Sequence, residues 1–162
     1  MRSIEMKKDN ALSHGNADYL LMLDDDLLLH ELLKRGQYNW INRDVTDNHF
    51  PHIPCGGMGG ISIESMILLC FNRMMTTPEV LFAFVRSGLK AATPHALLSF
   101  GCNYPAIQLQ FSIPALGMTW RNHFGYPQMV FLCGSGTMDR RVNLHQEDVP
   151  WGPRCHFAAL EA

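Results

Sequence analysis

Two histidines and a cysteine at three-residue spacing form the most metal-like pattern in this 162-residue chain, His49-x-x-His52-x-x-Cys55. Imidazole nitrogen and thiolate sulfur suit zinc, which needs three or four donors that converge on one ion. Pro51 and Pro54 favour an extended backbone, which separates side chains three positions apart by about 10 Å. The sequence therefore predicts no metal site and no cofactor, with His49, His52 and Cys55 as the only candidate ligands.

A nucleophile for covalent catalysis would have to come from the segment L-C-G-S-G, as Cys133 or Ser135. His145 or His156 would then act as the base, and Asp148 would orient it. In the G-x-S-x-G elbow of hydrolases the serine lies between a strand and a helix. Here the glycines and serine follow a predicted strand and are typical of a hairpin turn. We therefore predict an ordinary turn at this segment.

A third group of candidates lies near the C-terminus, where Arg141, Asn143 and His145 occupy alternate positions of a predicted strand, with Trp151 close behind. Alternate strand positions share one face of a sheet. Such a face could bind a protein partner or a small acidic ligand, or it could be a solvated surface. These four residues are the predicted binding residues if the face is a site.

Charge excludes a dedicated nucleic-acid binder. The chain has 13 basic and 15 acidic residues, a formal net charge of −2, and no basic cluster beyond isolated pairs. Residues 76–100 have the outline of a helix–turn–helix, but a recognition helix needs basic and amide side chains on its outer face. Here that face is predicted to carry His95 and Ser99. We expect no contact with nucleic acid.

Cysteine usage and hydropathy indicate a soluble cytoplasmic protein. The five cysteines are an odd number without a C-x-x-C pair, which favours reduced thiols. The longest apolar stretch, Met66 to Phe71, has six residues, and a membrane span needs about 20. We expect no membrane association, and homo-oligomerisation stays open.

Three helices are predicted from their boundary residues. Asp24, Asp25 and Asp26 are expected to open a helix over about 25–35, stabilising its N-terminus. Three consecutive helical positions fan out over about 200°, so these carboxylates would not converge on one ion. Thr76 or Thr77 with Pro78, and Thr93 with Pro94, predict the starts of two further helices that end at Gly88 and Gly101.

The remaining pattern is that of β-strands, expected at 61–71, 111–120, 128–133, 140–144 and 155–160. Pro114 predicts an edge position or a bulge. The last strand is apolar on both faces, which predicts a place inside the sheet. Together these elements predict an α+β fold: a single domain over 17–162, with N-terminal and central helices packed on a mainly antiparallel sheet of about five strands, preceded by a flexible N-terminus, 1–16.

From Gly88 onward the chain resembles a group of short, uncharacterised bacterial proteins with the pattern G-L-R-P-A-T-x-x-E-L-L-x-F-G-x-x-Y-P-x-L-Q-x-x-F-P-I-V-A-L-G-S-x-W. The matching positions are Gly88, Leu89, Ala92, Thr93, Leu97, Leu98, Phe100, Gly101, Tyr104, Pro105, Gln108, Phe111, Ala115, Leu116, Gly117 and Trp120. The chain departs from the pattern at Ser112, where the group has proline, and at Ala96, where it has glutamate. The resemblance implies no activity and no catalytic residue, because the shared positions are those of packing and turns.

No acid, base and nucleophile can be brought together from this sequence. The leading hypothesis is therefore a non-catalytic binding or interaction module. The alternative is a small enzyme, a hydrolase or transferase that uses a Cys/His pair.

Overall fold

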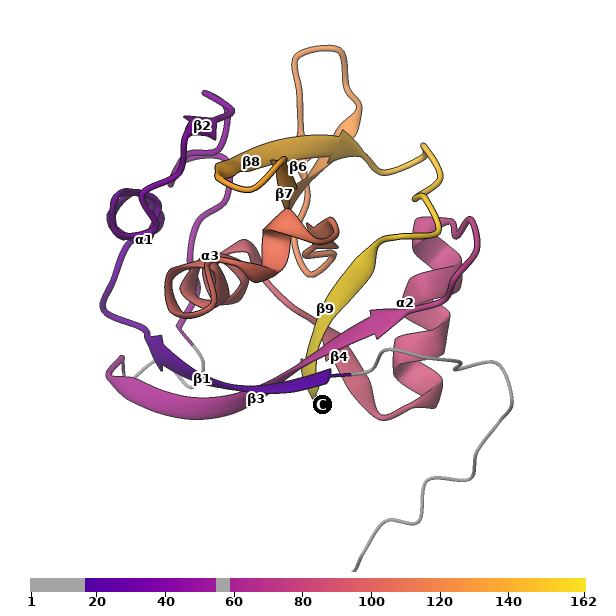
Figure 1. Ribbon diagram of the computed structural model, residues 1–162, viewed down its shortest axis with the longest axis horizontal. Coiled ribbons are helices and arrows are strands. Elements are labelled where there is room, and N and C mark those ends of the chain that lie inside the picture. Colours follow the sequence, from indigo (N-terminus) through magenta and orange to yellow (C-terminus); the bar gives the residue numbers. More distant parts are fainter. Residues whose placement is uncertain (1–16, 55–58) are drawn as a thin grey trace, which may run out of the picture.

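The computed structural model describes residues 17–54 and 59–162, and its fold is α+β, as predicted. The strands form two sheets rather than one, with the orders β1-β3-β9-β4 and β2-β8-β7-β5, and β6 pairs with β7 (Figure 1). Only β2 and β8 pair in parallel within the described part. The predicted flexible N-terminus, 1–16, and Cys55 lie outside the described residues. The strands are β1 Ala17–Asp24, β2 Trp40–Ile41, β3 Ile61–Cys70, β4 Leu89–Ala91, β5 Ile113–Pro114, β6 Trp120–Arg121, β7 Pro127–Ser135, β8 Asp139–Gln146 and β9 His156–Glu161; the helices are α1 Leu29–Arg35, α2 Thr77–Arg86 and α3 Pro94–Asn103.

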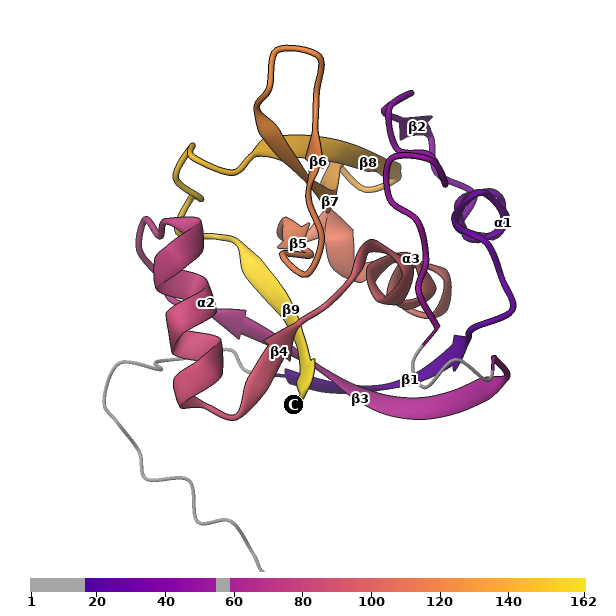
Figure 2. The same ribbon diagram turned by 180° about the vertical axis from the view of Figure 1, so that it is seen from behind.

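Helix α3 lies between the two sheets, and α2 covers the outer face of the first sheet near β9 and the edge strand β4 (Figures 1 and 2). Residues 94–101 are all buried, so α3 is enclosed on every side. This helix carries the central core, because apolar residues of both sheets pack around it. A second cluster forms between α2 and the outer face of the sheet, with Val80 and Phe84 against Leu69 and Phe157.

Strand β9 occupies the place predicted from its two apolar faces. It lies between β3 and β4, and its residues 157–160 are all buried. Ala158 and Leu160 belong to the central core, whereas Phe157 and Ala159 belong to the cluster under α2. Alternate side chains therefore bury on opposite faces of one strand.

Both predicted threonine caps are present. The hydroxyl of Thr76 accepts a hydrogen bond from the Glu79 amide, and the Glu79 carboxylate accepts one from the Thr76 amide. The hydroxyl of Thr93 accepts from the Ala96 amide. Helix α3 does not end at Gly101 but runs on to Asn103. In the described part of the chain, no helix is long and apolar enough to cross a membrane.

The first helix differs from its prediction. It begins at Leu29, and the three aspartates precede it at the end of β1 and in the following turn. The carboxylate that stabilises its N-terminus is that of Asp47, which accepts hydrogen bonds from the Leu29 amide at 2.7 Å and from the His30 amide. A carboxylate distant in sequence has taken the role expected of Asp24 to Asp26.

The predicted strand 111–120 is divided into β5 and β6, which have two residues each. Pro114 lies in β5 at the edge of its sheet, where it was expected. Ile113 and Leu116 are buried, whereas Phe111 and Trp120 are only partly buried. The segment between the two short strands leaves the sheet and passes over the start of α3.

Candidate functional site

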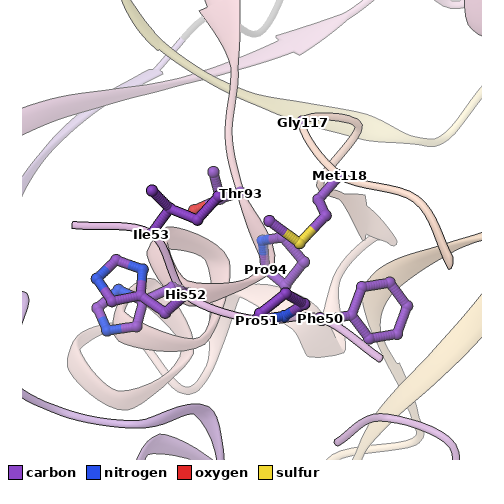
Figure 3. A pocket seen from close by; sticks show the side chains of 9 residues that line it. Phe50, Pro51, His52, Ile53, Thr93, Pro94, Gly117 and Met118 are labelled. Carbon is purple, nitrogen blue, oxygen red and sulfur yellow. The ribbon is translucent and has the colours of Figure 1, made fainter. Parts of the chain in front are cut away.

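A cavity of about 220 Å³ opens where three segments meet: the extended residues 50–53, the N-terminus of α3 and residues 117–118 (Figure 3). Its wall is mostly apolar, with Phe50, Pro51 and Met118 among the lining residues. The polar side chains in the wall are those of His52, Thr93 and His95. Thr93 already caps α3, so the two imidazoles are the polar groups that offer chemistry to the cavity.

The imidazoles of His52 and His95 are stacked, with ring centroids 3.6 Å apart and planes 11° from parallel. Nε2 of His52 lies 2.9 Å from Oδ1 of Asp25, and Nε2 of His95 lies 2.9 Å from the carbonyl oxygen of Leu27. A carbonyl and an ionised carboxylate can only accept, so Nε2 of each ring carries a hydrogen. No hydrogen bond in the described structure engages Nδ1 of either ring.

One tight turn supplies both acceptors. The Leu27 amide donates to the Asp24 carbonyl at 3.1 Å, and the Asp25 amide donates to the Gly60 carbonyl at 2.9 Å. Asp25 and Leu27 are thereby fixed between the end of β1 and the start of α1. The turn therefore holds a carboxylate against one ring and a carbonyl against the other.

The backbone also closes tightly around the cavity at Gly117. Its amide donates to the Ala92 carbonyl at 2.8 Å, and a Cβ at this position would lie 2.6 Å from that oxygen. Only glycine permits this approach. Because Ala92 and Thr93 lead directly into α3, the contact fixes residues 117–118 over the N-terminus of the helix that carries His95.

The cluster is largely removed from solvent. The side chains of Asp25 and His52 are 13% and 10% exposed, and His95 is 3% exposed. Burial lowers the pKa of His95 below its usual range, and the neighbouring His52 lowers it further. His95 is therefore uncharged at neutral pH, with the lone pair of Nδ1 unprotonated.

Asp25, His52 and His95 also satisfy a geometric condition for metal binding. Each offers one donor atom that lies within 4.8 Å of the donors from the other two. This group shares only His52 with the ligands considered from the sequence. His49 is held elsewhere, stacked on Trp120 with Nδ1 2.7 Å from the Asp44 carbonyl oxygen.

Neither candidate nucleophile forms a hydrogen bond with a histidine in the described structure. Cys133 pairs with Arg141 across β7 and β8, four residues from His145, a separation of about 13 Å along a strand. Ser135 lies at the exposed end of the same hairpin, and His156 lies in the other sheet, stacked on Phe111. Burial raises the pKa of the Cys133 thiol, which disfavours the reactive thiolate.

The candidate binding residues on β8 have partners within the chain. Arg141 pairs with Asp139 at 2.7 Å, and Asn143 accepts from the side-chain amide of Asn42. His145 stacks on Trp151 and bonds the Val149 carbonyl oxygen. Trp151 is only 2% exposed and donates its ring N–H to Thr77. The structure thus places these residues on or beside β8, and the polar group of each side chain has a partner within the chain.

Sequence reasoning missed Asp25 and His95 as site residues. Asp25 was interpreted as part of a helix N-terminus, and His95 as an outward residue of a helix. One signal was available: residues 94–101 are nearly all apolar or small, which is typical of a helix enclosed on all sides. A histidine in such a helix must have a buried partner.

No protein-family model matches this chain, and no curated protein or solved structure matches it significantly.

Proposed function

We propose that this chain is a binding module for a small, largely apolar molecule that carries one polar group, held in the cavity beside His52 and His95. Ligand sites are typically concave and apolar, with a few fixed polar groups that orient the ligand. The cavity has this composition. Its volume of about 220 Å³ exceeds the ~150 Å³ that accommodates benzene in an engineered apolar cavity.

The observation that carries the proposal is the fixed pair of imidazoles. Their Nε2 atoms are occupied by Asp25 and by the Leu27 carbonyl, so the rings cannot turn without losing a hydrogen bond. Their Nδ1 atoms have no partner in the described structure. A neutral imidazole with a free Nδ1 accepts a hydrogen bond, so the preferred polar group is a donor such as a hydroxyl.

The alternative of a Cys/His enzyme has less support. Burial raises the pKa of Cys102, of Cys133 and of Cys155, the last to about 11. None of these thiols is hydrogen-bonded to a histidine in the described structure. A nucleophilic thiol needs the opposite arrangement, a lowered pKa beside a base.

The test is titration with benzyl alcohol and with toluene, which has the same ring but no hydroxyl, followed by NMR of the methionine methyl and histidine ring signals. We expect benzyl alcohol to shift the signals of Met118, His52 and His95, and toluene to bind more weakly. Absence of any shift at these residues up to the solubility of both probes contradicts the proposal.

A matched pair of variants locates the site. Met118→Trp places a larger side chain in the cavity wall and should abolish the shifts. Met22→Trp makes the same change on the exposed face of β1, where Met22 is 58% exposed, and should leave them intact. Thermal unfolding of both variants checks that each is folded. Equal loss of binding in the two variants would contradict the assignment of the binding site to this cavity.

A further inference from the structure

The geometry points to a divalent transition-metal site formed by Asp25, His52 and His95, with zinc as the best-suited ion. The inference rests on the proposed function in one respect: the ion would form the polar wall of the same cavity. The three residues come from the turn after β1, the extended segment 51–54 and the second residue of α3. Their donor atoms already lie within 4.8 Å of one another.

The donor set selects the class of ion. Two imidazole nitrogens and one carboxylate oxygen suit zinc and its first-row neighbours, whereas calcium and magnesium prefer oxygen ligands alone. A cluster of one carboxylate and two imidazoles also favours a cation over an anion. Three protein ligands leave a fourth zinc position open, as in sites that bind a water or a ligand.

The surroundings of the His95 ring are those of a metal-binding histidine. Such a histidine usually donates its other ring N–H to a carboxylate or a backbone carbonyl, which fixes the ring and its tautomer. His95 has this arrangement with the Leu27 carbonyl oxygen. The Nε2 atom of His52 instead contacts Asp25, which is itself one of the three proposed ligands. All three side chains are at most 13% exposed, so an ion held by them would be largely shielded from bulk water.

A second histidine–carboxylate pair, His30 and Asp47, lacks two features of the Asp25, His52 and His95 cluster: low exposure and a second imidazole. Nδ1 of His30 lies 2.7 Å from Oδ2 of Asp47, but the His30 side chain is 64% exposed, and among the described residues no second imidazole joins the pair. An ion there would have two donors and would compete with bulk water. His30 therefore serves as the matched control for His52.

The experiment is a zinc titration of chelator-treated protein against a competing indicator, repeated with cobalt so that visible absorption reports the ligand geometry. We expect one ion per chain. His52→Gln and His95→Gln should each weaken zinc binding by about 100-fold or more, and Asp25→Asn by at least about tenfold. His30→Gln should change it by less than about threefold. Circular dichroism of each apo variant separates loss of binding from loss of folding.

Two further variants decide between this site and the pattern seen in the sequence. The two candidate ligand sets share His52, so His49→Gln and Cys55→Ser should keep zinc binding if the inference is right. Loss of binding in these two, with binding retained in His95→Gln, would overturn it. So would the absence of stoichiometric zinc binding by the unaltered chain.

Repeating the benzyl alcohol titration with and without zinc separates the two proposals. Zinc binding that depends on His95, without any benzyl alcohol shift at Met118, supports the metal site and contradicts the proposed function. A benzyl alcohol shift at Met118 without stoichiometric zinc binding does the reverse. Zinc-dependent strengthening of benzyl alcohol binding supports both.

Discussion

Two polar clusters lie beside the central core, one around Arg140 and one around His95, and they differ in how completely the chain satisfies them. The guanidinium of Arg140 donates to the carbonyls of Pro105, Gly36 and Gly101 and to the Gln108 side chain. Its cation also lies 4.6 Å from the centroid of the Tyr38 ring. Every nitrogen of this side chain therefore has a partner.

The His95 cluster has the opposite balance. Each ring is fixed through Nε2, yet each Nδ1 is left without a partner in the described structure, and both residues line a cavity. Buried polar groups that serve only the fold are normally satisfied within the protein, and the exception among the described residues is the Tyr38 hydroxyl beside Arg140. Arg140 thus joins the C-terminal ends of α1 and α3 to β8. We infer from this difference that the His95 cluster is the one suited to bind a ligand.

Arg140→Met should give the largest loss of stability. It removes four charge-assisted hydrogen bonds, so we expect about 3 kcal/mol or more of lost unfolding free energy by denaturant titration. Arg141→Met is the control, because Arg141 is half exposed and forms only a surface pair with Asp139, so less than about 1 kcal/mol is expected. Equal losses of unfolding free energy in Arg140→Met and Arg141→Met would contradict the structural role of Arg140.

Gly101→Ala tests the packing beside Arg140. Alanine normally stabilises a helix interior relative to glycine, but a Cβ here would collide with the Tyr38 hydroxyl, and we expect a loss of about 1–3 kcal/mol. That hydroxyl is buried and has no hydrogen-bond partner. Tyr38→Phe should therefore cost little and should restore the stability of Gly101→Ala. Additive losses in the double variant, measured by a double-mutant cycle, would contradict the collision.

The sequence was informative where a signal is local. Threonine and proline placed the starts of α2 and α3, and the apolar run on both faces of β9 placed it inside a sheet. Strand β1 gave no such signal, because its outer face carries Leu20 and Met22, so the apolar and polar residues do not alternate. Its pairing with β3 depends on residues 37 to 51 positions away.

The candidate site could not be predicted because its parts are distant in sequence and locally ambiguous. Asp25, His52 and His95 are separated by 27 and 43 positions, and the turn that fixes Asp25 needs Gly60. The same carboxylate would have suited a helix N-terminus, which Asp47 in fact stabilises. Local chemistry identified His52 as a possible ligand, but only the packing of α3 shows which residues join it.

His95→Gln should lower the stability of the apo protein far less than Arg140→Met does, but it should weaken zinc binding far more. Glutamine can still donate to the Leu27 carbonyl, so we expect a loss of only about 1 kcal/mol in the apo protein. Zinc should stabilise the unaltered chain in thermal unfolding, by an amount that rises with its free concentration, and should leave this variant unchanged. A large apo destabilisation would place His95 with Arg140 among the residues that serve the fold.

The smallest expected effect concerns His156, which separates the pH response of the fold from that of the site. Burial lowers the pKa of His156, whose ring stacks on Phe111 at a centroid distance of 3.4 Å. In the unfolded chain the imidazole has its ordinary pKa of about 6.5, so below that pH the unfolded state binds more protons than the folded state. The stability linked to His156 is therefore fully present above about pH 7 and is lost as the pH falls toward the lowered folded value. The slope of unfolding free energy against pH reports how many more protons the unfolded state binds. Between pH 7 and 5 we expect this number to fall by less than one in His156→Gln. The measurement is made with chelator present, so that no metal ion contributes. A slope that His156→Gln leaves unchanged would mean that the pH dependence arises elsewhere, and the buried, uncharged His95 would then be the first residue to test.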